Sequence, residues 1–126
     1  MSQMSQEIID CMSGLTECDE QILSAQFVFP KEFIGFQGHF DNNPILPGIC
    51  KIRAVVVMCE KHYNKAFRLK EVVSAKYVAP VTYAQKITVV CNLTTNKSGS
   101  VNVQAVIEDE GKKVAMLKLY LENQNG

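Results

Sequence analysis

The stretch between Pro47 and His62 most constrains the fold, because its centre, Ala54-Val55-Val56-Val57-Met58, is apolar on every residue. Three consecutive valines are poor helix formers, so a buried strand is also compatible with this run. Pro47 and Gly48 favour a helix, because the first turn has N–H groups without intrahelical partners and proline has none to lose. This start and a length of about four turns favour a helix over residues 48–62. A helix that is apolar nearly all round needs apolar cover on most sides.

The segment 36–48, directly before this helix, has the composition of a functional site. It reads Phe-Gln-Gly-His-Phe-Asp-Asn-Asn-Pro-Ile-Leu-Pro-Gly. The imidazole of His39 titrates near neutrality and can move a proton. Gly48 allows a ligand to approach the backbone closely, and the amino end of a helix favours an oxygen that gains negative charge. The competing interpretation is a histidine that hydrogen-bonds its own loop and does nothing else.

Three blocks of this segment carry a family resemblance: Gly38-His39-Phe40, Pro44-Ile45-Leu46 and Pro47-Gly48. At this spacing they resemble the signature of the hotdog-fold β-hydroxyacyl thioester dehydratases. That signature reads Gly-His-Phe-Pro, two variable residues, Pro-(Val/Ile)-(Met/Leu)-Pro-Gly and then a central helix. Asp41 stands at the position where the family usually has proline. The resemblance implies an α+β hotdog fold, with an antiparallel sheet of about five to six strands wrapped around one long central helix.

The resemblance also implies a reaction, the interconversion of 3-hydroxyacyl and trans-2-enoyl thioesters carried by acyl carrier protein or coenzyme A. It implies no metal and no cofactor, and a setting in fatty acid biosynthesis. His39 would take the proton from C2, or act on the hydroxyl in the reverse hydration, and the backbone N–H of Gly48 would bind the thioester carbonyl. The residues expected to line the acyl site are Phe40, Pro44, Ile45, Leu46, Pro47 and Ile49.

Arg53 departs from the family pattern, because it stands fourteen positions after His39, where the family places an acid. A guanidinium is a poor proton donor at neutral pH. It can still orient a hydroxyl or carboxylate or attract a phosphopantetheine phosphate, and a structural ion pair is the alternative. Glu60 fits a solvated carboxylate at the helix end better than a replacement acid. Asp41 can orient His39 or replace the acid.

The resemblance implies a homodimer or a higher oligomer of dimers, in which His39 of one subunit faces Arg53 of the other. A heterodimer, in which a different hotdog subunit supplies the acid, is a second possibility. A non-catalytic acyl-thioester-binding protein is a third. A hotdog thioesterase fits less well, because the Gly-His-Phe signature is not typical of those enzymes.

Composition limits the other classes of function. Thirteen basic and thirteen acidic residues leave no net charge, which gives no support for nucleic-acid or anionic-membrane binding. Five cysteines without a Cys-x-x-Cys pair indicate a reduced protein. No membrane span and no leader pattern are found, so we expect a cytoplasmic protein. A solvated face, or else a contact with an acidic carrier protein, is predicted for Lys51, Lys61, Lys65, Arg68 and Lys70.

The rest of the chain is predicted to complete a single hotdog domain over residues 1–126. Apolar residues at helical spacing predict a short helix within an N-terminal helical segment, residues 1–20. Turn residues at 96–99 and 109–111 indicate hairpins. The predicted strands cover residues 21–30, 68–78, 85–95, 100–108 and 113–122.

Overall fold

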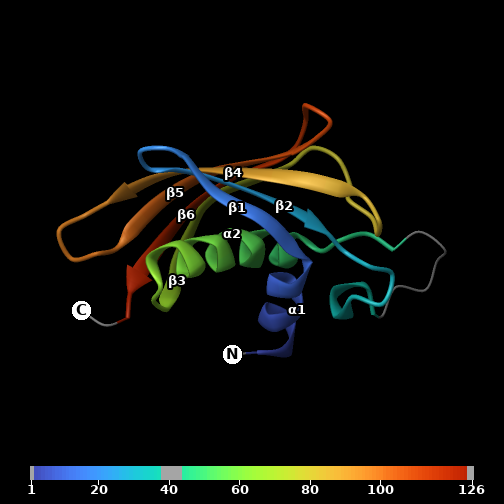
Figure 1. The fold of residues 1–126 in the computed structure, drawn as a ribbon, viewed down its shortest axis with the longest axis horizontal. Coiled ribbons are helices and arrows are strands. Elements are labelled where there is room, and N and C mark those ends of the chain that lie inside the picture. The colour runs from blue at the N-terminus through green and yellow to red at the C-terminus, as the bar shows by residue number, and fades with distance from the viewer. Residues whose placement is uncertain (1, 38–43, 125–126) are drawn as a thin grey trace.

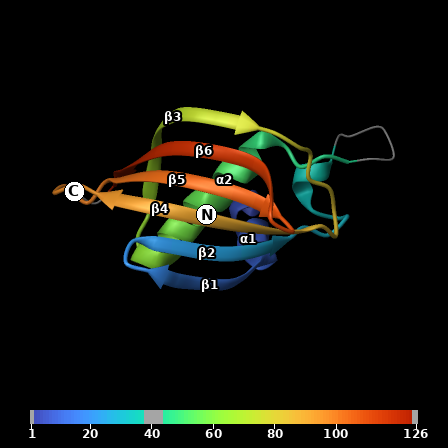
Figure 2. The same cartoon turned by 90° about the horizontal axis from the view of Figure 1, so that it is seen from above.

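A six-stranded antiparallel sheet curls over a central helix in the computed structural model, which describes residues 2–37 and 44–124 (Figure 1). The strand order is β1-β2-β4-β5-β6-β3, and α2 crosses beneath the strands (Figure 2). The α+β hotdog prediction is therefore confirmed. The elements in chain order are α1 (Gln3–Cys11), β1 (Met12–Asp19), β2 (Ile22–Val28), the 3₁₀ helix η1 (Ile34–Phe36), α2 (Gly48–Tyr63), β3 (Phe67–Tyr77), β4 (Lys86–Thr95), β5 (Val101–Asp109) and β6 (Lys112–Asn123).

Helix α2 provides the centre of the core. Every residue from Ala54 to Cys59 is buried, including the three consecutive valines. Three valines cost a helix about 1–2 kcal/mol relative to alanine, whereas burying one valine side chain contributes about 1.5–3 kcal/mol. Burial therefore outweighs the poor helix propensity. The helix ends at Tyr63, and Asn64 caps it in the left-handed conformation with φ 55°.

The N-terminal segment corrects one expectation. Helix α1 ends at Cys11, and residues 12–19 form the edge strand β1 instead of continuing a helical segment to residue 20. The chain reverses at Gln21, where φ is 67°, and β1 pairs antiparallel with β2. Most of β1 is exposed. It therefore lacks the alternation of apolar residues that identifies a strand in a sequence, and its pairing with β2 decides its conformation.

The remaining strands lie within two residues of their predicted positions. The predicted hairpin turns occur between β4 and β5 and between β5 and β6, with positive φ at Gly99 and Gly111. No helix among the described residues is long and apolar enough to cross a membrane.

A cluster of phenylalanines fixes the chain that leads from β2 toward the predicted site. The rings of Phe29 and Phe33 lie 4.8 Å apart, and those of Phe33 and Phe36 lie 5.7 Å apart. Glu7 of α1 accepts a hydrogen bond from the Ile34 N–H at 3.0 Å. These contacts attach η1 to both the core and α1.

Gly35 provides a test of this packing. A Cβ atom at Gly35 would lie 2.4 Å from Phe33 Cε2 and 2.9 Å from Cys50 Sγ, and both neighbours are buried. We expect Gly35→Ala to lower the free energy of unfolding by about 1–3 kcal/mol, because a packed core resists added volume. Urea denaturation measures this. In a Phe33→Leu background the loss should be smaller, and an equal loss would contradict the close contact with the Phe33 ring.

Candidate active site at the start of the central helix

The first turn of α2 offers an unpaired backbone donor. Pro47 precedes the helix with φ −61° and ψ 150°, and its carbonyl accepts the Cys50 N–H at 3.0 Å. Within residues 2–37 and 44–124, the N–H of Gly48 makes no hydrogen bond. The N–H groups of a first helical turn have no intrahelical acceptor and lie at the positive end of the helix dipole. Gly48 can therefore donate to an oxygen of a ligand.

Two hydrogen bonds attach the chain before α2 to the segment that follows β3. The Leu46 N–H donates to the Val81 carbonyl at 2.7 Å, and the Thr82 hydroxyl donates to the Pro44 carbonyl at 2.7 Å. The Leu46 side chain is buried. Val81 and Thr82 are distant in sequence from the segment before α2. The position of Gly48 therefore depends on tertiary structure.

An open depression of about 610 Å³ lies at this helix start, and we call it the helix-start depression. Its lining is mostly apolar, and its polar groups come from Gly48, Lys51 and Tyr77. Ligand sites commonly combine an apolar wall with a few polar groups of this kind. The lining residues are Ile45, Leu46, Pro47, Gly48, Lys51, Tyr77, Val78, Ala79 and Pro80.

Tyr77, at the end of β3, lies against Gly48. A Cβ atom at Gly48 would lie 2.6 Å from the Tyr77 hydroxyl oxygen, so only glycine allows the ring to lie this close. The Tyr77 side chain is 46% exposed at the same time, and partial burial raises the pKa of its phenol. No local pattern in the sequence indicates that Tyr77 lies beside a helix start 29 residues earlier in the chain.

Lys51 is the second residue whose position the sequence does not indicate. The sequence predicts a solvated face or a carrier-protein contact for it, whereas it is only 4% exposed. Its Nζ atom lies 3.5 Å from the Leu46 carbonyl oxygen and 5.1 Å from the centre of the Tyr77 ring. Burial lowers the pKa of the Lys51 ammonium. The available signal was its position three residues after Gly48, which places both on one side of the helix.

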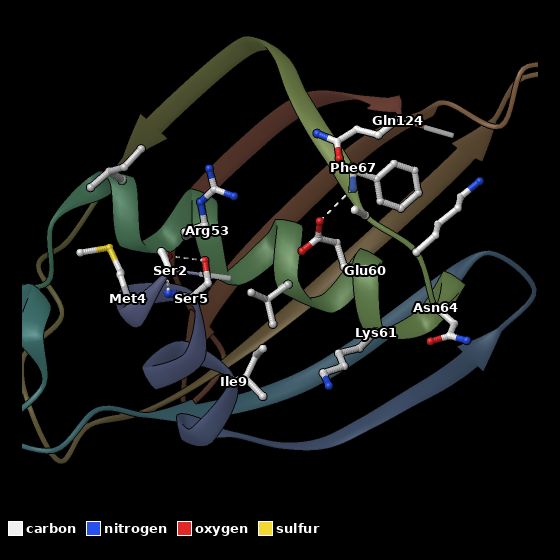
Figure 3. A pocket seen from close by; sticks show the side chains of 14 residues that line it. Ser2, Met4, Ser5, Ile9, Arg53, Glu60, Lys61, Asn64, Phe67 and Gln124 are labelled. Carbon is white, nitrogen blue, oxygen red and sulfur yellow. Dashed lines mark hydrogen bonds between the residues drawn. The ribbon is translucent and has the colours of Figure 1, made fainter. Parts of the chain in front are cut away.

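Arg53 lies in a different cavity. Two residues along a helix correspond to a rotation of about 200°, so Arg53 and Lys51 are on opposite sides of α2. Arg53 contributes to a cavity of about 720 Å³ between α1, α2 and the start of β3 (Figure 3). The other lining residues are Ser2, Met4, Ser5, Ile9, Ile49, Val57, Glu60, Lys61, Asn64, Lys65, Ala66, Phe67 and Gln124.

Glu60 corrects the expectation of a solvated carboxylate. Its Oε2 atom accepts a hydrogen bond from the Phe67 N–H at 2.8 Å, and the side chain is partly buried (Figure 3). This bond fixes the first residue of β3 to the last turns of α2. Glu60 therefore has a structural role in the described chain.

The predicted site residues fall into three groups. His39, Phe40 and Asp41 lie outside the residues that the structure describes. Residues 44–48 lie together around the start of α2, and four of them line the helix-start depression. Ile49, which is 53% exposed, lines the Arg53 cavity instead. Among the described residues, no three His, Cys, Asp or Glu side chains are placed to hold a metal ion.

The sheet, the central helix and the open N–H at the helix start together define a hotdog-like protein with a candidate oxyanion-binding position. Residues 15–118 match the model of the ApeI-like family, described as ApeI dehydratase. The chain belongs to this ApeI-like dehydratase family. The search of curated proteins found no match.

Solved structures share the fold at low sequence identity. The dehydratase heterocomplex ApeI:P from Xenorhabdus doucetiae matches with a TM-score of 0.73 at 15% identity, covering 89% of this chain and 96% of that one. The conserved protein PA5202 from Pseudomonas aeruginosa matches with a TM-score of 0.68 at 14% identity, covering 98% and 94%. An HP0420 homologue from Helicobacter felis matches with a TM-score of 0.68 at 15% identity, covering 90% and 89%.

The contact between Gly48 and Tyr77 can be tested with a double-mutant cycle. In a Tyr77→Ala background, Gly48→Ala should raise the free energy of unfolding by about 0.4–1 kcal/mol, because alanine restricts the unfolded chain. With Tyr77 present, this gain should vanish or reverse, because the new Cβ displaces the ring. Urea denaturation of the four proteins gives the coupling. Equal effects in both backgrounds would show that the ring does not lie on Gly48.

Proposed function

We propose that this protein is a 3-hydroxyacyl-thioester dehydratase that acts on acyl groups carried by acyl carrier protein or coenzyme A. It interconverts 3-hydroxyacyl and trans-2-enoyl thioesters in fatty acid or related lipid metabolism. Membership of the ApeI-like dehydratase family is the observation that carries the proposal. A cytoplasmic location is part of it and rests on the cysteine pattern of the sequence.

The geometry at the start of α2 supports a role for Gly48. Removal of a proton from C2 places negative charge on the thioester carbonyl oxygen, and a fixed N–H donor stabilises that charge. The Gly48 N–H is unpaired within the described chain and opens beside apolar residues. In this proposal Gly48 binds the carbonyl, Ile45, Leu46 and Pro47 contact the acyl chain, and His39 is the base.

The exposed edge of the sheet supports a second subunit. Strand β3 is an edge strand whose outer backbone groups pair with no described strand, and most of its residues are exposed. Such an edge readily pairs with another chain. Exposed apolar side chains continue along it and around the helix start, namely Val72, Val73, Tyr77, Val78, Ile45 and Ile49. We propose that a second hotdog subunit covers this surface.

The identity of the second subunit decides which residue faces His39, where the family resemblance implies an acid. A homodimer built as the family resemblance implies would bring Arg53, and not an acid, toward His39. The similar protein from Xenorhabdus doucetiae forms a dehydratase heterocomplex. A heterodimer in which a different hotdog subunit completes the site is therefore the second candidate for this chain.

A substitution that places a charge on β3, Val73→Lys, tests the subunit interface. Val73 is 53% exposed at the sheet edge, and a charged residue there disfavours edge pairing. We expect Val73→Lys to convert the assembly into monomers, as measured by light scattering after size exclusion. Val28→Lys is the matched control, because Val28 is 41% exposed on β2 and lies away from this edge. An unchanged oligomer in Val73→Lys would contradict an interface at β3.

The reaction is tested by incubating the protein with 3-hydroxyacyl and enoyl thioesters, alone and with candidate hotdog partners. Absorbance of the conjugated enoyl thioester reports turnover. We expect His39→Ala to reduce kcat by about 10²–10⁴-fold, because a general base contributes that much. Arg53→Glu should raise activity if the family acid is the limiting group.

The outcomes separate the candidates. Activity of the chain alone supports a homodimeric enzyme, and activity only with a partner supports the heterodimer. Tight acyl binding without turnover under either condition would replace the dehydratase proposal with a non-catalytic acyl-thioester-binding protein.

A further inference from the structure

A buried lysine at the helix-start depression lacks an acidic counterpart among the described residues. Lys51 is 4% exposed, and the ion pairs of the described chain do not include it. Its contacts there are the Leu46 carbonyl at 3.5 Å, at the long limit of a hydrogen bond, and the Tyr77 ring at 5.1 Å. Burying an ammonium without a counter-charge is unfavourable. An ammonium carries three donors, so Lys51 has donors left for a ligand.

Lys51 and Gly48 share one side of α2. Three residues correspond to about 4.5 Å along the axis and a rotation of about 60° short of a full turn. Both residues line the helix-start depression, and of its described lining residues Lys51 is the only charged one. Arg53 lines the other cavity. A thioester held by the Gly48 N–H would therefore place its 3-hydroxyl, two carbons from the carbonyl carbon, near Lys51 and away from Arg53 of the same chain.

We propose that Lys51 recognises the 3-hydroxyl of the substrate and donates the proton with which that hydroxyl leaves as water. This inference rests on the proposed dehydratase function. The base removes a proton from C2, and the electron pair of that C–H bond forms the C2–C3 double bond. The C3–O bond breaks, its electron pair leaves with oxygen, and the oxygen takes a proton from the Lys51 ammonium. The products are water and the trans-2-enoyl thioester, and the base then returns one proton while Lys51 regains one through solvent.

The chemistry of lysine suits this role better than that of arginine. A guanidinium stays protonated, whereas a buried ammonium gives up its proton more readily. Burial lowers the pKa of Lys51 toward the range in which general acids work. Tyr77 is the other polar side chain in the depression, and burial raises the pKa of its phenol, whereas burial lowers the pKa of Lys51.

Recognition of the 3-hydroxyl by Lys51 is tested by comparing the binding of two ligands that differ only in this hydroxyl. A His39→Ala background removes the proposed base, so the ligands are not consumed during calorimetry. The probes are 3-hydroxyoctanoyl and octanoyl pantetheine thioesters, with the chain in the assembly in which it is active. With Lys51 present, the hydroxylated ligand should bind about tenfold more tightly, the worth of one good hydrogen bond. Lys51→Met should abolish this difference, and Lys61→Met, on the exposed end of the same helix, should retain it.

Turnover with His39 intact tests proton donation. Lys51→Met should lower kcat by about 10²-fold or more, the contribution of a general acid. Lys51→Gln separates the two roles, because an amide can hydrogen-bond the hydroxyl but cannot supply the proton. It should restore the binding difference without restoring kcat. Thermal melts check that each variant is folded, and removal of a buried unpaired charge should not destabilise the protein.

The outcomes distinguish failure of this inference from failure of the proposed function. If the parent protein neither binds nor converts the thioesters, the dehydratase proposal fails and Lys51 loses its role with it. If the parent is active and Lys51→Met keeps both kcat and the preference for the hydroxyl, only the Lys51 assignment is overturned. Loss of the preference in Tyr77→Phe, with retention in Lys51→Met, would also overturn it.

Discussion

The burial of an apolar helix by a curled sheet is the interaction on which the rest of this structure depends. The three valines at the centre of α2 are buried. On the sheet side, β2, β4, β5 and β6 cover the helix with the inward-facing residues that alternate along each strand. A helix of this composition is stable only under such cover. Once the cover is in place, the axis of α2 is fixed, and with it the position of the first turn.

The first turn of α2 lies at the end of the apolar core and carries the polar group of the proposed site, the Gly48 N–H. The Gly48 N–H cannot be satisfied within the helix, and the chain around it is held by hydrogen bonds from Leu46 to Val81 and from Thr82 to Pro44. A donor that is fixed before a ligand arrives needs no reorganisation to stabilise developing charge. The same bonds that order the turn therefore prepare the proposed oxyanion position.

Two charged residues of α2, Arg53 and Lys51, line different cavities. Arg53 stands where the family resemblance implies an acid, and it lies beside α1 and the start of β3. Lys51 shares the helix-start depression with Gly48. Sequence spacing alone directs attention to Arg53. The burial of Lys51 and its place beside Gly48 are the reasons why we propose Lys51, on the other side of the same helix, as the proton donor. The outer edge of β3 pairs with no described strand, and β3 reaches both cavities, through Phe67 at its start and Tyr77 at its end.

The sequence by itself determined most strands and their hairpin turns, because alternation and turn chemistry act over a few residues. The Pro47-Gly48 pair favoured a helix that starts at Gly48, although the apolar run that follows was also compatible with a strand. The sequence also indicated that residues 44–48 belong together at the helix start. It did not reveal β1, whose exposed residues lack alternation, or the contact of Tyr77 with Gly48, whose partners are distant in the chain. Nor did it distinguish Lys51 from its exposed neighbours. Which charged side chain is buried, and in which cavity, depends on what packs against each side of α2, and only the tertiary structure decides that.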